Sequence, residues 1–141
     1  MWRTIIAVLG GAIAWIVIAT AGNLVLRQVL PGYAEVEKSM HFDLPMMASR
    51  LVLGALACLG AGFVAAWIGR GRRSGVWILV ALLLALFIPE HYALRDKLPL
   101  WYHLAFLLSL LVLTVAGGSL YRPTSPVPAG SADSGGEAAQ P

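Results

Sequence analysis

Four long apolar runs, separated by polar stretches, constrain this chain more than any other feature of its sequence. They cover residues 2–26, 44–68, 75–94 and 98–121. A hydrocarbon core about 30 Å thick is crossed by about 20 helical residues, which each run reaches. Because backbone polar groups in lipid need partners within their own segment, each run is expected to be a helix. The expected fold is therefore an all-α membrane protein, a bundle of four transmembrane helices with short loops.

The third run reaches this length only by continuing through a proline. Residues 76–88 are purely apolar, but 13 residues span only about 20 Å at about 1.5 Å each. Extension past Pro89 to Leu94 gives about 28 Å, and Pro89 should kink the helix because it removes a backbone donor. Between the first two runs, residues 27–43 form a polar excursion with a turn at Pro31 and Gly32.

Composition excludes several classes of protein. Hydrophobic residues make up 59% of the chain and charged residues 12%, against about 25% charged residues in soluble domains. This argues against a soluble enzyme, a disordered chain and a disulfide scaffold. The net charge of +3 comes without a long basic patch, so no nucleic-acid partner is expected. The single cysteine, Cys58, lies inside an apolar run and is expected to be a small packing residue.

Basic residues indicate the orientation. One side would carry Arg3, Arg70, Arg72, Arg73 and Arg122; the other would carry Arg27, Lys38, Arg50, Arg95 and Lys97. The counts are equal, but residues 70–73 hold three arginines in one short loop without acids, and such loops resist translocation. Both termini are therefore expected in the cytoplasm. The membrane is expected to be the inner (plasma) membrane of a bacterium. Residues 122–141 are rich in Pro, Ser, Gly and Ala and are expected to form a disordered cytoplasmic tail.

The first run allows a second interpretation. Residues 1–3 resemble the positive start of a signal peptide, residues 5–18 its apolar core and residues 19–21 a cleavage site. The apolar character continues through Val25, which favours an uncleaved first helix. Both interpretations give the same orientation, and the intact mass would separate them.

Small residues at a spacing of four mark one face of the second run: Gly54, Cys58, Gly62 and Ala66. Helices in lipid associate through close backbone approach, which small side chains allow. Thr114, Gly117 and Gly118 provide a similar face in the fourth run. Packing within the bundle is the favoured interpretation of these faces, and a homo-oligomer interface is the alternative.

A candidate polar cluster lies at the non-cytoplasmic end and consists of Arg50, Glu90, His91, His103 and Asn23. Ionisable groups at membrane depth are costly and are therefore candidates for function. We expect Arg50 to lie near Glu90, with His91 or His103 close by; the alternative is that these groups snorkel to the interface. No tight ligand motif such as His-x-x-x-His links the histidines, so neither a metal site nor a cofactor is expected.

The hairpin formed by residues 89–92 and 99–103, together with the late Gly117 and Gly118, resembles that of small, uncharacterised four-helix membrane proteins found in many bacteria. The resemblance covers the four-span layout and the Pro-x-Trp-Tyr entry to the fourth helix. It implies the fold and no activity. The first run lacks the embedded glutamate that small multidrug exporters use for proton coupling.

Three function classes remain open. The first is a non-enzymatic accessory or interaction protein whose partners are the bilayer and a second copy or another membrane protein. The second is a small oligomeric transporter or channel, which flux into liposomes would reveal. The third is a membrane enzyme or metal site that uses the outer His and Glu residues, which stoichiometric bound metal would favour. No catalytic motif is present, so we expect a protein that is not an enzyme.

Overall fold

The computed structural model describes residues 1–122, and every regular element within them is a helix. The helices are α1 (Trp2–Val29), α2 (Tyr33–Ser39), α3 (Leu44–Ile68), α4 (Arg73–Ala93) and α5 (Leu100–Leu120). All except α2 are long and apolar enough to cross a membrane. The all-α class and the four long apolar helices are confirmed. The expected disordered tail follows Arg122 and lies outside the residues that the structure describes.

Helix α2 is a correction to the expected layout, because its residues were predicted to form only part of a polar loop. Gly32 precedes it with a φ of 76°, and Met40 ends it with a φ of 58°. The left-handed backbone at Gly32 costs little because glycine has no Cβ. A helix of 7 residues is marginal alone, so its stability must come from contacts that local sequence does not display. Tyr33, its first residue, is completely buried.

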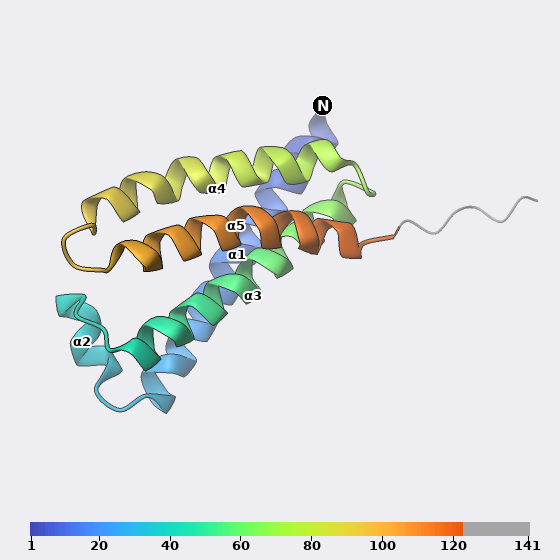
Figure 1. The fold of residues 1–141 in the computed structure, drawn as a ribbon. Coiled ribbons are helices and arrows are strands. Elements are labelled where there is room, and N and C mark those ends of the chain that lie inside the picture. The colour runs from blue at the N-terminus through green and yellow to red at the C-terminus, as the bar shows by residue number, and fades with distance from the viewer. Residues whose placement is uncertain (123–141) are drawn as a thin grey trace, which may run out of the picture.

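The four long helices form two pairs that cross each other (Figure 1). Helices α4 and α5 run antiparallel as a hairpin, and α1 and α3 pass beside them at an angle. Helix α3 packs against both α1 and α5 and is the most central element. Helix α2 lies at the end of the molecule where α3 begins, opposite the loop between α3 and α4.

The small-residue face of α3 is buried within the chain. Its four residues are all buried: Gly54, Cys58, Gly62 and Ala66. A Cβ atom on Gly62 would overlap the backbone carbonyl oxygen of Thr114, and one on Gly117 would overlap that of Leu59. The backbones of α3 and α5 therefore touch directly, which only glycine allows at these two positions. This face serves packing inside one chain.

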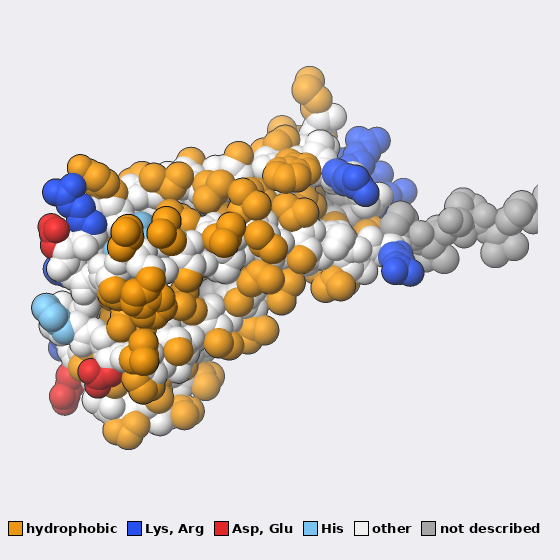
Figure 2. Space-filling view, in the orientation of Figure 1, with side chains coloured by type: hydrophobic (Ala, Val, Ile, Leu, Met, Phe, Trp, Pro, Cys, Tyr) orange, Lys and Arg blue, Asp and Glu red, His pale blue; other side chains and the backbone are white. Residues whose placement is uncertain are grey.

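Charged side chains gather at the two ends of the molecule, and the surface between them is largely hydrophobic (Figure 2). One end, beside the start of the undescribed tail, shows only Lys and Arg. The other end shows acidic, basic and histidine side chains together. The mixed end contains α2, the end of α1, the start of α3 and the loop that joins α4 to α5.

Candidate functional site

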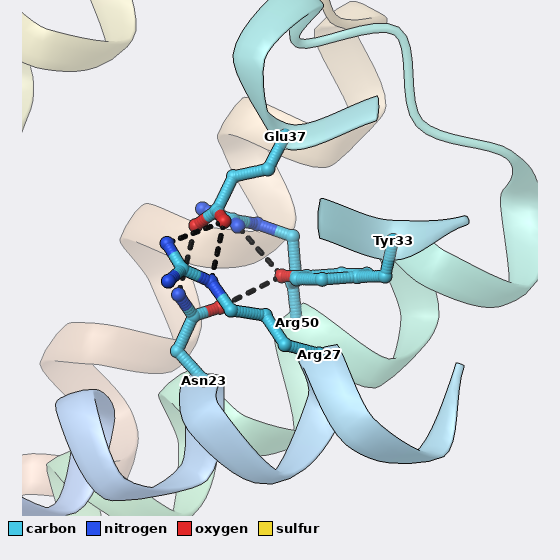
Figure 3. A network of polar contacts seen from close by, with 5 residues as sticks. All are labelled: Asn23, Arg27, Tyr33, Glu37 and Arg50. Atoms are coloured by element: carbon cyan, nitrogen blue, oxygen red, sulfur yellow. Dashed lines mark hydrogen bonds and ion pairs between the residues drawn. The ribbon is translucent and has the colours of Figure 1, made fainter. Parts of the chain in front are cut away.

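A chain of polar contacts joins α1, α2 and α3 at the mixed end (Figure 3). The Arg27 guanidinium forms an ion pair with the Glu37 carboxylate, with Nη2 2.7 Å from Oε2. The same carboxylate accepts a hydrogen bond of 2.8 Å from Nδ2 of Asn23. Glu37 is thereby fastened to two residues one turn apart on α1, which fixes α2 against that helix.

Tyr33 extends this chain of contacts to α3. Its hydroxyl donates to Oδ1 of Asn23 at 2.9 Å and accepts from Nη1 of Arg50 at 2.8 Å. The Arg50 guanidinium also lies over the Phe42 ring, 4.7 Å from the ring centroid, an attractive arrangement for a cation. Arg50 is therefore held by a neutral hydroxyl and an aromatic face.

The charges in this network alter the acidity of the two α2 residues. Burial raises the pKa of the Tyr33 hydroxyl, although the Arg50 charge and hydrogen bond oppose this. Partial burial also acts to raise the pKa of Glu37, but hydrogen bonds from Asn23 and Arg27 and the charges of Arg27 and Arg50 outweigh it and lower that pKa. At neutral pH, Tyr33 is therefore a neutral hydroxyl and Glu37 a carboxylate.

The ion pair expected between Arg50 and Glu90 is not formed. Within the part of the chain that the structure describes, the ion pairs are Arg27–Glu37 and Arg95–Asp96. Glu90 is exposed, and Arg50 turns instead to Tyr33. The reason is tertiary, because α2 supplies the hydroxyl that accepts the hydrogen bond from the guanidinium.

The histidines at this end form a pair. Nδ1 of His91 lies 2.6 Å from Nδ1 of His103, and Nε2 of His103 lies 3.2 Å from the Leu98 carbonyl oxygen. Since a carbonyl only accepts, Nε2 of His103 carries the hydrogen of that bond. If both rings are neutral, Nδ1 of His91 donates to His103 and Nε2 of His91 is left as an acceptor.

A cavity of about 620 Å³ lies beside these groups, and α1, α3, α4 and α5 all contribute to its wall. Four of the five candidate cluster residues line it: Asn23, Arg50, Glu90 and His91. His103 does not line it and reaches it only through His91. Apart from the pair that His91 forms with His103, the candidate residues are thus brought together around one space without direct contacts between their polar groups that would neutralise Arg50 or Glu90.

The remainder of the wall is mostly apolar and comes largely from the facing sides of α1 and α4. Its larger side chains there are Trp15, Ile16, Leu83, Leu86 and Phe87. Ile16 and Leu86 are more than half exposed, at 58% and 57%, so the cavity reaches the apolar surface between α1 and α4. It therefore combines a long apolar part with one polar end.

Sequence reasoning did not select Arg27, Tyr33, Glu37, Phe42 or Tyr102, all of which belong to this region. If residues 33–39 are taken to be a helix, the spacing of four residues places Tyr33 and Glu37 on one face of it. This spacing is the sequence feature that could have indicated their shared site. No group of three or more His, Cys, Asp or Glu side chains within residues 1–122 is placed to hold a metal ion.

The chemistry that this arrangement offers is recognition of a molecule with one polar and one apolar part. At the polar end are a guanidinium, a carboxylate, an imidazole and the Tyr102 phenol, and the rest of the wall is hydrocarbon and aromatic. No protein-family model, curated protein or solved structure matches this chain.

Proposed function

We propose that this chain is a non-enzymatic integral membrane protein that binds a membrane-dissolved amphiphile in the cavity between α1 and α4. The supporting observation is the cavity of about 620 Å³ itself, apolar along α1 and α4 and polar where Asn23, Arg50 and Glu90 line it. Ligand sites are commonly concave and mostly apolar, with a few convergent polar groups. An amphiphile could enter sideways from the bilayer, where Ile16 and Leu86 are exposed.

Native mass spectrometry from mild detergent tests this proposal. Wild-type protein should retain one phospholipid-sized adduct. Ala19→Phe, which places a large side chain in the cavity, should not retain this lipid adduct. Ala21→Phe is the matched control, because Ala21 is exposed and does not line the cavity. Equal retention by the two variants would contradict the proposal. Ion or solute flux into liposomes would instead favour an oligomeric transporter or channel, and stoichiometric bound metal would favour an enzyme.

The proposed location is the bacterial inner membrane, with both termini and the loop containing Arg70, Arg72 and Arg73 in the cytoplasm. Among the described residues, the charged side chains visible at this end of the molecule are all Lys or Arg, which supports this orientation (Figure 2). In a Cys58→Ala background, a membrane-impermeant thiol reagent should label a cysteine placed at Ser39 and miss one placed at Ser74. The opposite labelling pattern would reverse the orientation and leave the cavity proposal intact.

A further inference from the structure

Two opposite charges line the cavity without neutralising each other. Within residues 1–122, Arg50 forms no ion pair with a carboxylate, and the nearby Glu37 is already paired with Arg27. Glu90 likewise forms no ion pair with any cation of the described residues. With neutral histidines, the lining of the cavity therefore has zero net charge but carries both signs.

The remaining polar group of His91 adds an acceptor on the carboxylate side. Nδ1 of a neutral His91 donates its hydrogen bond to Nδ1 of His103. The Nε2 lone pair of His91 is therefore not used in the histidine pair and can accept another hydrogen bond. His91 and Glu90 are consecutive residues of α4 and both line the cavity. Helix α4 thus offers two acceptors, whereas α3 offers the guanidinium donors of Arg50.

We infer that the cavity binds a phospholipid-like amphiphile whose headgroup carries both a phosphate and a primary ammonium; this inference rests on the proposed function. The phosphate binds the Arg50 guanidinium, whose planar donors suit phosphate oxygens. The ammonium donates to the Glu90 carboxylate and to Nε2 of His91. A headgroup with only a negative charge would bind Arg50, but it would leave the Glu90 carboxylate without a positive partner.

The apolar part of the cavity would hold the part of the acyl chains nearest the headgroup, and the rest of the chains would lie in the bilayer outside Ile16 and Leu86, which are exposed. Acyl chains would extend from the polar end along Trp15 and Ile16 of α1 and Leu83 and Leu86 of α4. These residues lie toward the middle of their helices, and the charged groups lie near the helix ends. Headgroup and chains would therefore keep the depths that they have in the surrounding bilayer.

A three-way competition tests the headgroup. Protein is equilibrated with equal amounts of dioleoyl phosphatidylethanolamine, phosphatidylcholine and phosphatidylglycerol, and the retained lipid is identified by native mass spectrometry. Phosphatidylethanolamine should exceed each of the others by about fivefold, because only its primary ammonium both balances Glu90 and donates hydrogen bonds. Phosphatidylcholine has the same charges without these donors and is the closest control lipid.

Each outcome has one meaning. Retention of one lipid without headgroup preference would overturn this inference and leave the proposed function standing. Preference for phosphatidylglycerol would overturn it in favour of a purely anion-binding site. Failure of wild-type protein to retain any lipid would remove both proposals.

Two variants locate the selectivity. Glu90→Gln should reduce the preference for phosphatidylethanolamine over phosphatidylglycerol by only about threefold, since Glu90 is exposed and solvent screens its charge. Glu35→Gln removes an exposed carboxylate outside the cavity and should leave the preference unchanged. Arg50→Gln should lower retention of all three lipids. Because Arg50 also supports Tyr33, the Glu90 variant decides the outcome: an unchanged preference there would overturn the assignment of the ammonium.

Discussion

Near the loop between α3 and α4, the helices touch through glycine and alanine, whereas farther toward the α2 end larger aromatic side chains lie between α1 and α4. At the first end, Ala7 and Gly75 lie so that a Cβ on the glycine would be only 3.4 Å from the alanine Cβ. Farther along the helices, the rings of Trp15 and Phe87 are 4.7 Å apart, and both residues line the cavity, whose polar part lies at the α2 end.

The difference shows that two mechanisms hold this small bundle together. Lipid provides no hydrophobic drive for helix association, so close packing of small residues dominates where backbones meet. At the α2 end, a hydrogen-bonded network through Tyr33 and Glu37 joins α2 to α1 and α3. The packed end therefore carries stability, and the networked end carries the candidate site.

The largest loss of stability is expected when a methyl group is added at the packed end. Gly62→Ala would push a Cβ into the backbone of α5 at Thr114 and should destabilise the protein by about 3 kcal/mol. Gly60→Ala is the matched control, because its Cβ would meet only the end of the Ile18 side chain. Thermal unfolding in detergent measures both, and equal midpoints would show that backbone contact between α3 and α5 is unimportant.

Removing one hydroxyl should weaken the networked end by a smaller amount. Tyr33→Phe deletes the hydroxyl that accepts a hydrogen bond from Arg50 and donates one to Asn23, and it should cost about 2 kcal/mol, because it leaves a half-buried guanidinium short of a partner. Tyr92→Phe removes an exposed hydroxyl bonded to Arg95 and should be almost neutral. Similar losses for the two variants in thermal unfolding would contradict a special role for Tyr33.

Acidification should also weaken only the networked end. Because the folded-state pKa of Glu37 lies below its usual 4.5, the stability it contributes is present above that value and is lost as pH falls through the folded pKa. Glu37→Gln should be less stable than wild type by about 1 kcal/mol near neutral pH, and the difference should shrink below about pH 4.5. A pH-independent difference in unfolding midpoint would mean that the Glu37 charge is irrelevant.

The smallest effect concerns the two cavity charges that do not pair. Glu90→Gln and Arg50→Gln should be additive to within about 0.5 kcal/mol, as expected of residues that share no contact. A double-mutant cycle in a lipid-free detergent measures their coupling. A coupling well above 1 kcal/mol would restore the direct ion pair that the sequence analysis expected.

Helix positions were predictable because length and hydropathy are local properties. The run at 44–68 coincides with α3, and the bounds of α1, α4 and α5 differ from their runs by no more than three residues. Extension of α4 through Pro89 was predictable for the same reason, since the apolar run before the proline was too short to cross a bilayer. The expected kink at Pro89 remains a prediction.

Side-chain partners were not predictable from local patterns. Asn23, Arg50, Glu90 and His91 were recognised as polar residues at one end of the bundle, and they do surround one cavity. Arg50 was assigned the wrong partner because Tyr33, which receives its hydrogen bond, belongs to a helix absent from the expected layout.

The sequence by itself determined an all-helical chain with four long apolar helices and a small-residue face on α3, because these follow from hydropathy, length and spacing along one segment. Only the tertiary structure decided where α2 docks, that α1 and α4 diverge toward one end, and that Arg50 and Glu90 line a shared cavity without forming an ion pair with each other. Helix crossing angles and long-range hydrogen bonds depend on several segments at once, and no single run of residues encodes them.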